Sequence, residues 1–151
     1  MSDEERKPDE MTDEELEVLA RNTAGTPLPR VVARTNAEQI ERFQWLVRQV
    51  PVEQAIYEKA VGLVRSTRAS EPGATDSVRK YLKYGASVRA TQFLTLGAKA
   101  RALLEGRYHV TTEDLAALAK PILRHRLITN YFAESDGVSA DQILDELIAQ
   151  L

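Results

Sequence analysis

Apolar residues along this chain recur at the three- and four-residue spacing of amphipathic helices. No stretch shows the sustained alternation of apolar and polar residues that is typical of half-buried strands. Segments containing glycine and proline separate the periodic stretches. The pattern therefore predicts an all-α fold, a small helical bundle of six or seven helices.

Capping signals indicate where these helices begin. A Ser or Thr followed three residues later by Glu, Asp or Gln has the spacing of a capping box, and it occurs at Thr12, Thr35, Thr111 and Ser139. The expected helices cover residues 12–22, 35–50, 51–68, 77–83, 87–105 and 111–127, with a terminal helix from 139. Pro121 predicts a kink or restart within its helix, Gly106 is expected to be an αL cap, and residues 131–137 are expected to form a loop.

Composition divides the chain into three parts. Residues 1–11 are polar and acidic and are expected to be a disordered tail. Residues 12–34 are expected to hold one helix and a connector rich in proline and glycine, which links the tail to the rest of the chain. The remaining residues, 35–151, are expected to form one helical domain.

The composition also excludes several classes of site. The 151 residues include no cysteine and two histidines, His109 and His125, which lie far apart in the sequence. Thiol nucleophiles, disulfides and thiolate metal sites are therefore excluded, and no metal site is expected. No apolar run approaches the roughly 18 residues of a membrane span, and the acidic start does not resemble a signal peptide. We expect a cytoplasmic protein without membrane contact.

The net charge of −3 conceals an uneven distribution. Residues 1–20 carry −7, whereas residues 65–107 hold nine basic and three acidic side chains. A basic surface favours phosphates or an acidic protein partner, although a charge run is more often a solvated helix face. Nucleic-acid binding is not favoured, because the nine aromatic residues are expected to be mostly in the core and so provide no platform for base stacking.

No self-contained catalytic site is visible. A nucleotide hydrolase needs a glycine-rich loop with a lysine around the β- and γ-phosphates. The seven glycines are scattered, and none begins such a motif. Nearly all hydroxyl side chains are explained as helix caps rather than as nucleophiles. The chain is therefore not expected to be an enzyme on its own.

One short segment stands out from this background. In Tyr84-Gly85-Ala86-Ser87-Val88-Arg89, a glycine precedes a serine that can cap a helix and place Arg89 in its first turn. A cation is unfavourable there because the N-terminal end of a helix is already positive. The placement therefore indicates a bound anion. The alternative is a surface arginine paired with a nearby acid such as Asp76.

Several blocks, in order, resemble the lid domain of MoxR-type AAA+ ATPases, from about Thr35 to the C-terminus. The segment Lys83-Tyr84-Gly85-Ala86-Ser87-Val88-Arg89-Ala90 is similar to the YGASPRA block of that family. The other blocks are Ala98-Lys99-Ala100-Arg101-Ala102-Leu103-Leu104, Gly106-Arg107-Tyr108-His109-Val110 with Glu113-Asp114, and Pro121-Ile122-Leu123-Arg124-His125-Arg126 with Asn130. A weaker similarity over residues 12–27 suits the segment that joins the ATPase core to the lid.

The resemblance implies a role for Arg89 as the sensor 2 arginine, which reaches from the lid to the γ-phosphate of ATP on the core. Lys83, Tyr84, Gly85 and Ser87 would support the start of its helix. Val88 departs from the family, which usually has proline there, and the placement of Arg89 could be looser as a result. Walker A, Walker B, sensor 1 and the arginine finger are missing, so ATP and Mg²⁺ would bind only through a separate core.

The resemblance also implies partners: a P-loop core domain, the ring oligomer of the parent ATPase and a von Willebrand factor A-domain protein, with chaperone-like remodelling as the outcome. A different interpretation stays open beside it. The chain could be a free-standing helical protein-interaction module with no nucleotide role, whose acidic start and basic middle are docking surfaces.

Overall fold

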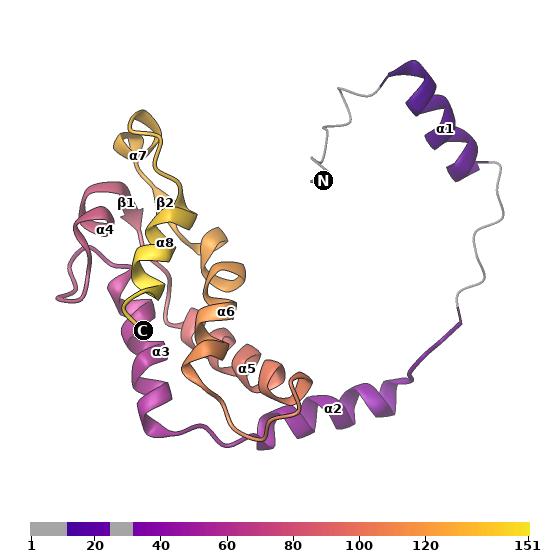
Figure 1. The fold of residues 1–151 in the computed structure, drawn as a ribbon, viewed down its shortest axis with the longest axis horizontal. Helices are drawn as coiled ribbons and strands as arrows, with labels where there is room; N and C mark the ends of the chain where they lie inside the picture. Colours follow the sequence, from indigo (N-terminus) through magenta and orange to yellow (C-terminus); the bar gives the residue numbers. More distant parts are fainter. Residues whose placement is uncertain (1–11, 25–31) are drawn as a thin grey trace. The chain divides into compact units, whose positions relative to one another are not determined.

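The computed structural model describes residues 12–24 and 32–151 (Figure 1). The predicted tail over residues 1–11 lies outside the described residues. Contacts divide the chain into two compact units, one ending at Asn36 and one spanning Ala37–Leu151. The first unit contains α1 (Asp13–Ala24). Its predicted cap is present, since the backbone N–H of Thr12 donates to Glu15 Oε2 at 2.9 Å.

The second unit is a helical bundle. Its elements are α2 (Ala37–Gln49), α3 (Gln54–Ser66), α4 (Asp76–Tyr81), β1 (Leu82–Tyr84), α5 (Arg89–Leu104), α6 (Thr112–Leu123), the 3₁₀ turn η2 (Arg124–Arg126), β2 (Ile128–Thr129), α7 (Tyr131–Ser135) and α8 (Ala140–Ile148). The all-α prediction is confirmed, but the two described ranges hold eight α-helices rather than the six or seven expected, because residues 131–135 form a further helix. The capping boxes at Thr111 and Ser139 are formed as predicted.

Close contact between α5 and α6 forms the centre of the bundle (Figure 1). The buried side of α5 consists mainly of alanines, with Ala90, Ala98 and Ala102 fully buried. A Cβ atom at Gly97 would lie 3.1 Å from a methyl group of Leu118 on α6. Small side chains let two helix axes approach closely. The surrounding core is aliphatic and also draws on α3 and α8.

The two strands were not predicted, and they shorten the expected helix over residues 77–83. Helix α4 ends at Tyr81, and β1 pairs antiparallel with β2, with Leu82 opposite Thr129 and Tyr84 opposite Ile128. The Asn130 side chain donates to Lys80 O at 2.7 Å and thus holds the end of α4. The strand partner lies more than forty residues away in the sequence, so local periodicity carries no signal for it.

The predicted loop over residues 131–137 is wrong, because α7 occupies Tyr131–Ser135. Asn130 begins this helix by accepting a hydrogen bond from Ala133 N at 3.1 Å. At its other end, Asp136 accepts from Lys80 at 2.9 Å and from the Tyr81 hydroxyl at 3.0 Å. These contacts hold the pKa of Asp136 below its usual value, with the Lys80 hydrogen bond as the largest cause.

Three predicted helix boundaries also differ. Helix α2 begins at Ala37 rather than Thr35, and α3 begins at Gln54, since the chain is still extended at Glu53. Pro51 therefore lies outside both helices. Helix α6 continues through Pro121 and ends two residues later at Leu123. A proline in the last turn of a helix removes one backbone hydrogen bond without displacing a following turn, so no restart occurs at Pro121.

A buried carboxylate links α5 to α6. Asp114 is fully buried, and its side chain accepts from Arg101 at 2.7 Å and from Arg107 at 2.6 and 2.8 Å. It also accepts from the backbone N–H of Thr111 at 2.9 Å. These donors, Arg107 first, hold the pKa of Asp114 well below its usual value. The cluster closes the turn at Gly106, which has the positive φ of 72° expected of an αL cap.

The aromatic residues are not in the core, which corrects the expectation from sequence. No aromatic side chain is buried in the described part of the chain, which contains all nine. Tyr81 is half-buried, and the other eight are exposed: Phe43, Trp45, Tyr57, Tyr84, Phe93, Tyr108, Tyr131 and Phe132. The argument that buried aromatics leave no stacking platform therefore no longer holds. Large exposed aromatic side chains are typical of surfaces that contact other proteins.

Within the described part of the chain, the helices are too short or too polar to cross a membrane. In the same part, no group of three or more His, Asp or Glu side chains is arranged to hold a metal ion. His109 and His125 are both exposed.

Candidate functional site

The predicted site residues lie on one continuous segment that leads from β1 into α5. Lys83 and Tyr84 are exposed residues of β1, and Gly85 and Ser87 belong to the following loop. Arg89 is the first residue of α5. The structure therefore brings the five residues together at the N-terminal end of the central helix.

Gly85 lies where the loop passes very close to the end of α3. A Cβ atom at this position would be 2.3 Å from the backbone oxygen of Thr67, a distance that real Cβ atoms do not show. Only glycine fits such an approach. Thr67 is fully buried, and its hydroxyl accepts from Ala86 N at 2.9 Å and donates to Val64 O at 2.7 Å. The loop is thereby fixed to α3.

Arg68 holds the same loop from its other side. Its guanidinium donates to the carbonyl oxygen of Ala86 at 3.2 and 3.3 Å. The N–H of Ala86 is therefore hydrogen-bonded to Thr67, the first residue after α3, and its C=O is hydrogen-bonded to Arg68, the next residue. These contacts set the position at which α5 begins, three residues farther along the chain. Thr67 and Arg68 were not identified from sequence, where nothing distinguishes them from other polar residues after a helix.

The first turn of α5 differs from the predicted one. Val88 rather than Ser87 is the residue at the helix boundary, and no side chain caps the helix. The backbone oxygen of Ser87, not its hydroxyl, accepts the hydrogen bond from Ala90 N at 2.9 Å. The capping role predicted for the Ser87 side chain is therefore wrong, because Val88 already has helical angles of −55° and −31°.

Arg89 is exposed, and within residues 12–24 and 32–151 its side chain has no hydrogen bond or ion pair. The alternative pairing with Asp76 is absent from the ion pairs of this part of the chain. A cation in the first turn of a helix lowers helix stability, since the aligned peptide dipoles are positive there. Arg89 thus combines an unfavourable position with a guanidinium that is available to an anion from outside the bundle.

Lys83 and Tyr84 make contact with each other at the rim of the site. The Lys83 ammonium lies 5.6 Å from the centre of the Tyr84 ring, within the range of a cation–π interaction. Tyr84 is also the cross-strand neighbour of Ile128, and both side chains are more than half exposed.

Comparison with known proteins places this site in a family context. Residues 75–147 match the family model described as the AAA lid domain. This chain is 27% identical to "Chaperone MoxR1" of Mycobacterium tuberculosis and 29% identical to "Uncharacterized protein YeaC" of Bacillus subtilis. Each match extends over 136 residues, which is 90% of this chain. The matched region is 36% and 40% of the length of these two relatives.

A solved structure agrees with the sequence relatives. The crystal structure of a candidate ATPase from Cytophaga hutchinsonii superimposes with a TM-score of 0.77 and 27% identity. The match covers 93% of this chain and 43% of that chain. The chain therefore corresponds to less than half of each of these proteins.

Proposed function

Because the helical bundle of this chain is a MoxR-type AAA+ lid domain, we propose that it closes over ATP held by a separate P-loop core and that Arg89 contacts the γ-phosphate. The observation that carries the proposal is the position of Arg89: exposed, without a partner in the described residues, and at the start of the central helix. The proposed contact between Arg89 and the γ-phosphate is the sensor 2 role.

The fixed loop supports such a role. A guanidinium that reports on a phosphate has to be placed reproducibly relative to the rest of the lid. The contacts of Thr67 and Arg68 with Ala86 hold the loop just before Arg89, and Gly85 permits the close approach. A movement of the γ-phosphate is then passed to α5 and from α5 to α6, which pack closely.

The coupling follows from a difference in affinity. Arg89 would contact ATP but lose its γ-phosphate partner in the ADP state, so that the closed lid is stabilised only before hydrolysis. Cycles of closure and release would drive chaperone-like remodelling of a client. We place the chain in a ring of ATPase subunits assembled mainly through their cores, with a von Willebrand factor A-domain protein as a further partner.

Substitution of Arg89 by alanine is expected to leave folding unchanged and to weaken nucleotide binding by the reassembled protein. Loss of one charge-assisted hydrogen bond to phosphate corresponds to about 10- to 100-fold in affinity or turnover. The measurement is calorimetry with Mg·ATP, first on the chain alone and then with a MoxR-type P-loop core that lacks its own lid. We expect no binding to the chain alone.

Two variants serve as controls for this experiment. Arg42→Ala removes an exposed arginine of α2 and should leave the nucleotide affinity of the mixture unchanged. Arg89→Lys keeps the charge but not the planar guanidinium and should give an intermediate loss. Equal nucleotide affinity in the wild-type and Arg89→Ala mixtures would remove Arg89 from the mechanism.

The exposed aromatic side chains favour a second candidate, a helical interaction module with no nucleotide role. The same calorimetric experiment separates the two functions. Binding of Mg·ATP that requires both the core and Arg89 supports the lid function, whereas no effect of the chain on the core favours the interaction module.

A further inference from the structure

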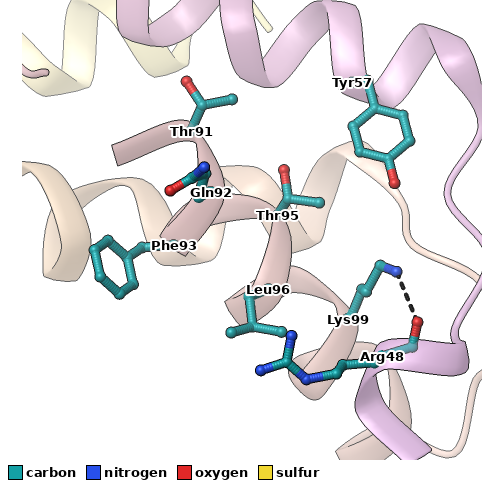
Figure 2. Close-up of a pocket in the computed structure, with 8 residues that line it drawn as sticks. All are labelled: Arg48, Tyr57, Thr91, Gln92, Phe93, Thr95, Leu96 and Lys99. Atoms are coloured by element: carbon teal, nitrogen blue, oxygen red, sulfur yellow. Dashed lines mark hydrogen bonds between the residues drawn. The ribbon is translucent and has the colours of Figure 1, made fainter. Parts of the chain in front are cut away.

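A groove lies between α5 and the adjoining parts of α2 and α3, and we call it the α2–α5 groove (Figure 2). Its volume is about 670 Å³, and it is lined by Arg48, Tyr57, Thr91, Gln92, Phe93, Thr95, Leu96 and Lys99. In Figure 2, Tyr57 of α3 and Phe93 lie to either side of α5. The Lys99 ammonium donates to Arg48 O at 3.1 Å and thereby holds the end of α2 against α5.

A second groove, the α6 groove, lies on the other side of α5. It has a volume of about 410 Å³ and is lined by Phe93, Leu96, Gly97, Ala100, Pro121, Ile122, His125 and Arg126. Phe93 and Leu96 belong to both grooves, so they form a ridge between them. Their side chains are 50% and 39% exposed, which leaves an apolar ridge facing solvent along one turn of α5.

The charge around the ridge has one sign. Arg48 and Lys99 line the α2–α5 groove, and Arg126 lines the α6 groove with its guanidinium 5.2 Å from the centre of the Phe93 ring. Among the described residues, no acidic side chain lines either groove. An apolar centre flanked by cations on both sides is complementary to an apolar face flanked by carboxylates.

The spacing of the apolar residues fits a helix. Phe93, Leu96 and Ala100 follow each other at three and four residues, so the ridge runs along the α5 axis. A helix laid along such a ridge places its own apolar side chains into the hollows on either side, as helices do when they pack. We propose that the two grooves together bind an amphipathic helix of a partner protein, with large apolar residues on one face and acidic residues along both edges.

This interaction surface goes beyond the proposed nucleotide role. None of the residues that line the two grooves is Arg89 or one of its supporting residues. Helix binding can therefore be measured on the chain alone, without nucleotide or core. Failure of either proposal leaves the other intact.

The test uses three synthetic peptides of about four helical turns. The acidic peptide carries Leu at positions i, i+3, i+4 and i+7 with Glu on both flanks; the basic peptide has Lys for every Glu, and the polar peptide has Ser for every Leu. Fluorescence anisotropy of the labelled peptides measures the dissociation constants. We expect binding of the acidic peptide only, weakened as NaCl rises from about 0.05 to about 0.5 M.

Two matched pairs of variants locate the binding surface. Arg48→Glu is expected to weaken binding of the acidic peptide about tenfold or more, whereas Arg42→Glu on the same helix is not, because Arg42 does not line the groove. Phe93→Ala should likewise weaken binding about tenfold, and Phe132→Ala, which removes an exposed phenylalanine from α7, should not. Far-UV circular dichroism of each variant verifies folding.

Three results would overturn the proposal. These are equal binding of the acidic and basic peptides, no binding of the acidic peptide, and an unchanged dissociation constant in Arg48→Glu. Sedimentation velocity tests a different occupant, a second copy of this chain. If the wild-type chain self-associates and Phe93→Ala abolishes this self-association, the grooves bind a second copy, and the proposal of an acidic partner helix is overturned.

Discussion

Substitution of Asp114 by asparagine is expected to lower the free energy of unfolding by about 3 kcal/mol. The carboxylate is fully buried and accepts from Arg101, Arg107 and Thr111. An amide in its place can accept only at one atom and, in either orientation, directs N–H groups toward the Arg107 guanidinium and toward one further donor, Arg101 or the Thr111 N–H. The two arginines remain about one-third exposed and keep some hydration. The expected loss of stability is therefore near the lower end of the range of about 3–5 kcal/mol that is typical when one partner of a buried ion pair is removed.

Urea unfolding followed by far-UV circular dichroism measures this loss, with Glu113→Gln as the matched control. Glu113 is the preceding residue and is exposed, so its substitution should change stability by less than about 0.5 kcal/mol. The pH dependence provides a second readout. Because the folded-state pKa of Asp114 is depressed, its stabilisation is present above the unfolded value of 3.8 and is lost as the pH falls.

The stability difference between wild type and Asp114→Asn should therefore be constant near neutral pH and narrow progressively below about pH 4. A difference that stays constant down to about pH 2 would show that the carboxylate charge does not cause the stabilisation. A wild-type chain and an Asp114→Asn chain of equal stability at neutral pH would contradict the prediction outright.

Substitution of Gly85 by alanine should be about as severe, with a loss of about 3 kcal/mol. The new methyl group would lie 2.3 Å from the Thr67 carbonyl oxygen and 2.7 Å from its hydroxyl oxygen. The loop would have to move away from α3, which breaks the hydrogen bond from Ala86 N to Thr67 and leaves a buried hydroxyl poorly satisfied. Thermal unfolding of the variant measures the loss.

Gly62→Ala is the matched control for this substitution. Gly62 lies inside α3, and a Cβ atom there meets nothing within 4 Å. The alanine should raise the stability by about 0.5–1 kcal/mol, because it restricts the unfolded chain and favours the helix. Gly85→Ala and Gly62→Ala variants that unfold at the same temperature would show that the close approach to Thr67 does not matter.

Local signals predicted the parts of the fold that depend on neighbouring residues. The capping boxes at Thr12, Thr111 and Ser139 marked real helix starts, because a capping box involves residues three positions apart. The αL turn at Gly106 is equally local. Ser87 is also a residue suited to a cap, but tertiary contacts of Ala86 set the helix boundary one residue later.

Parts of the fold that depend on distant residues could not be predicted in this way. The strand pair joins residues 82–84 to 128–129, and the contact of Gly85 with Thr67 spans 18 positions. In the candidate site, the contiguous segment from Lys83 to Arg89 was found from its sequence block. Thr67 and Arg68, which fix that segment in space, had no comparable signal.

The surface location of the aromatic side chains determines what optical methods report about this bundle. The core is aliphatic, and Trp45, the single tryptophan, is 59% exposed. Its indole group is largely hydrated in the folded chain and becomes fully hydrated on unfolding, so we expect its emission to change little in that transition. Loss of the helices is instead followed in the far-ultraviolet. We therefore expect intrinsic fluorescence to report on binding at the surface of the bundle rather than on its folding.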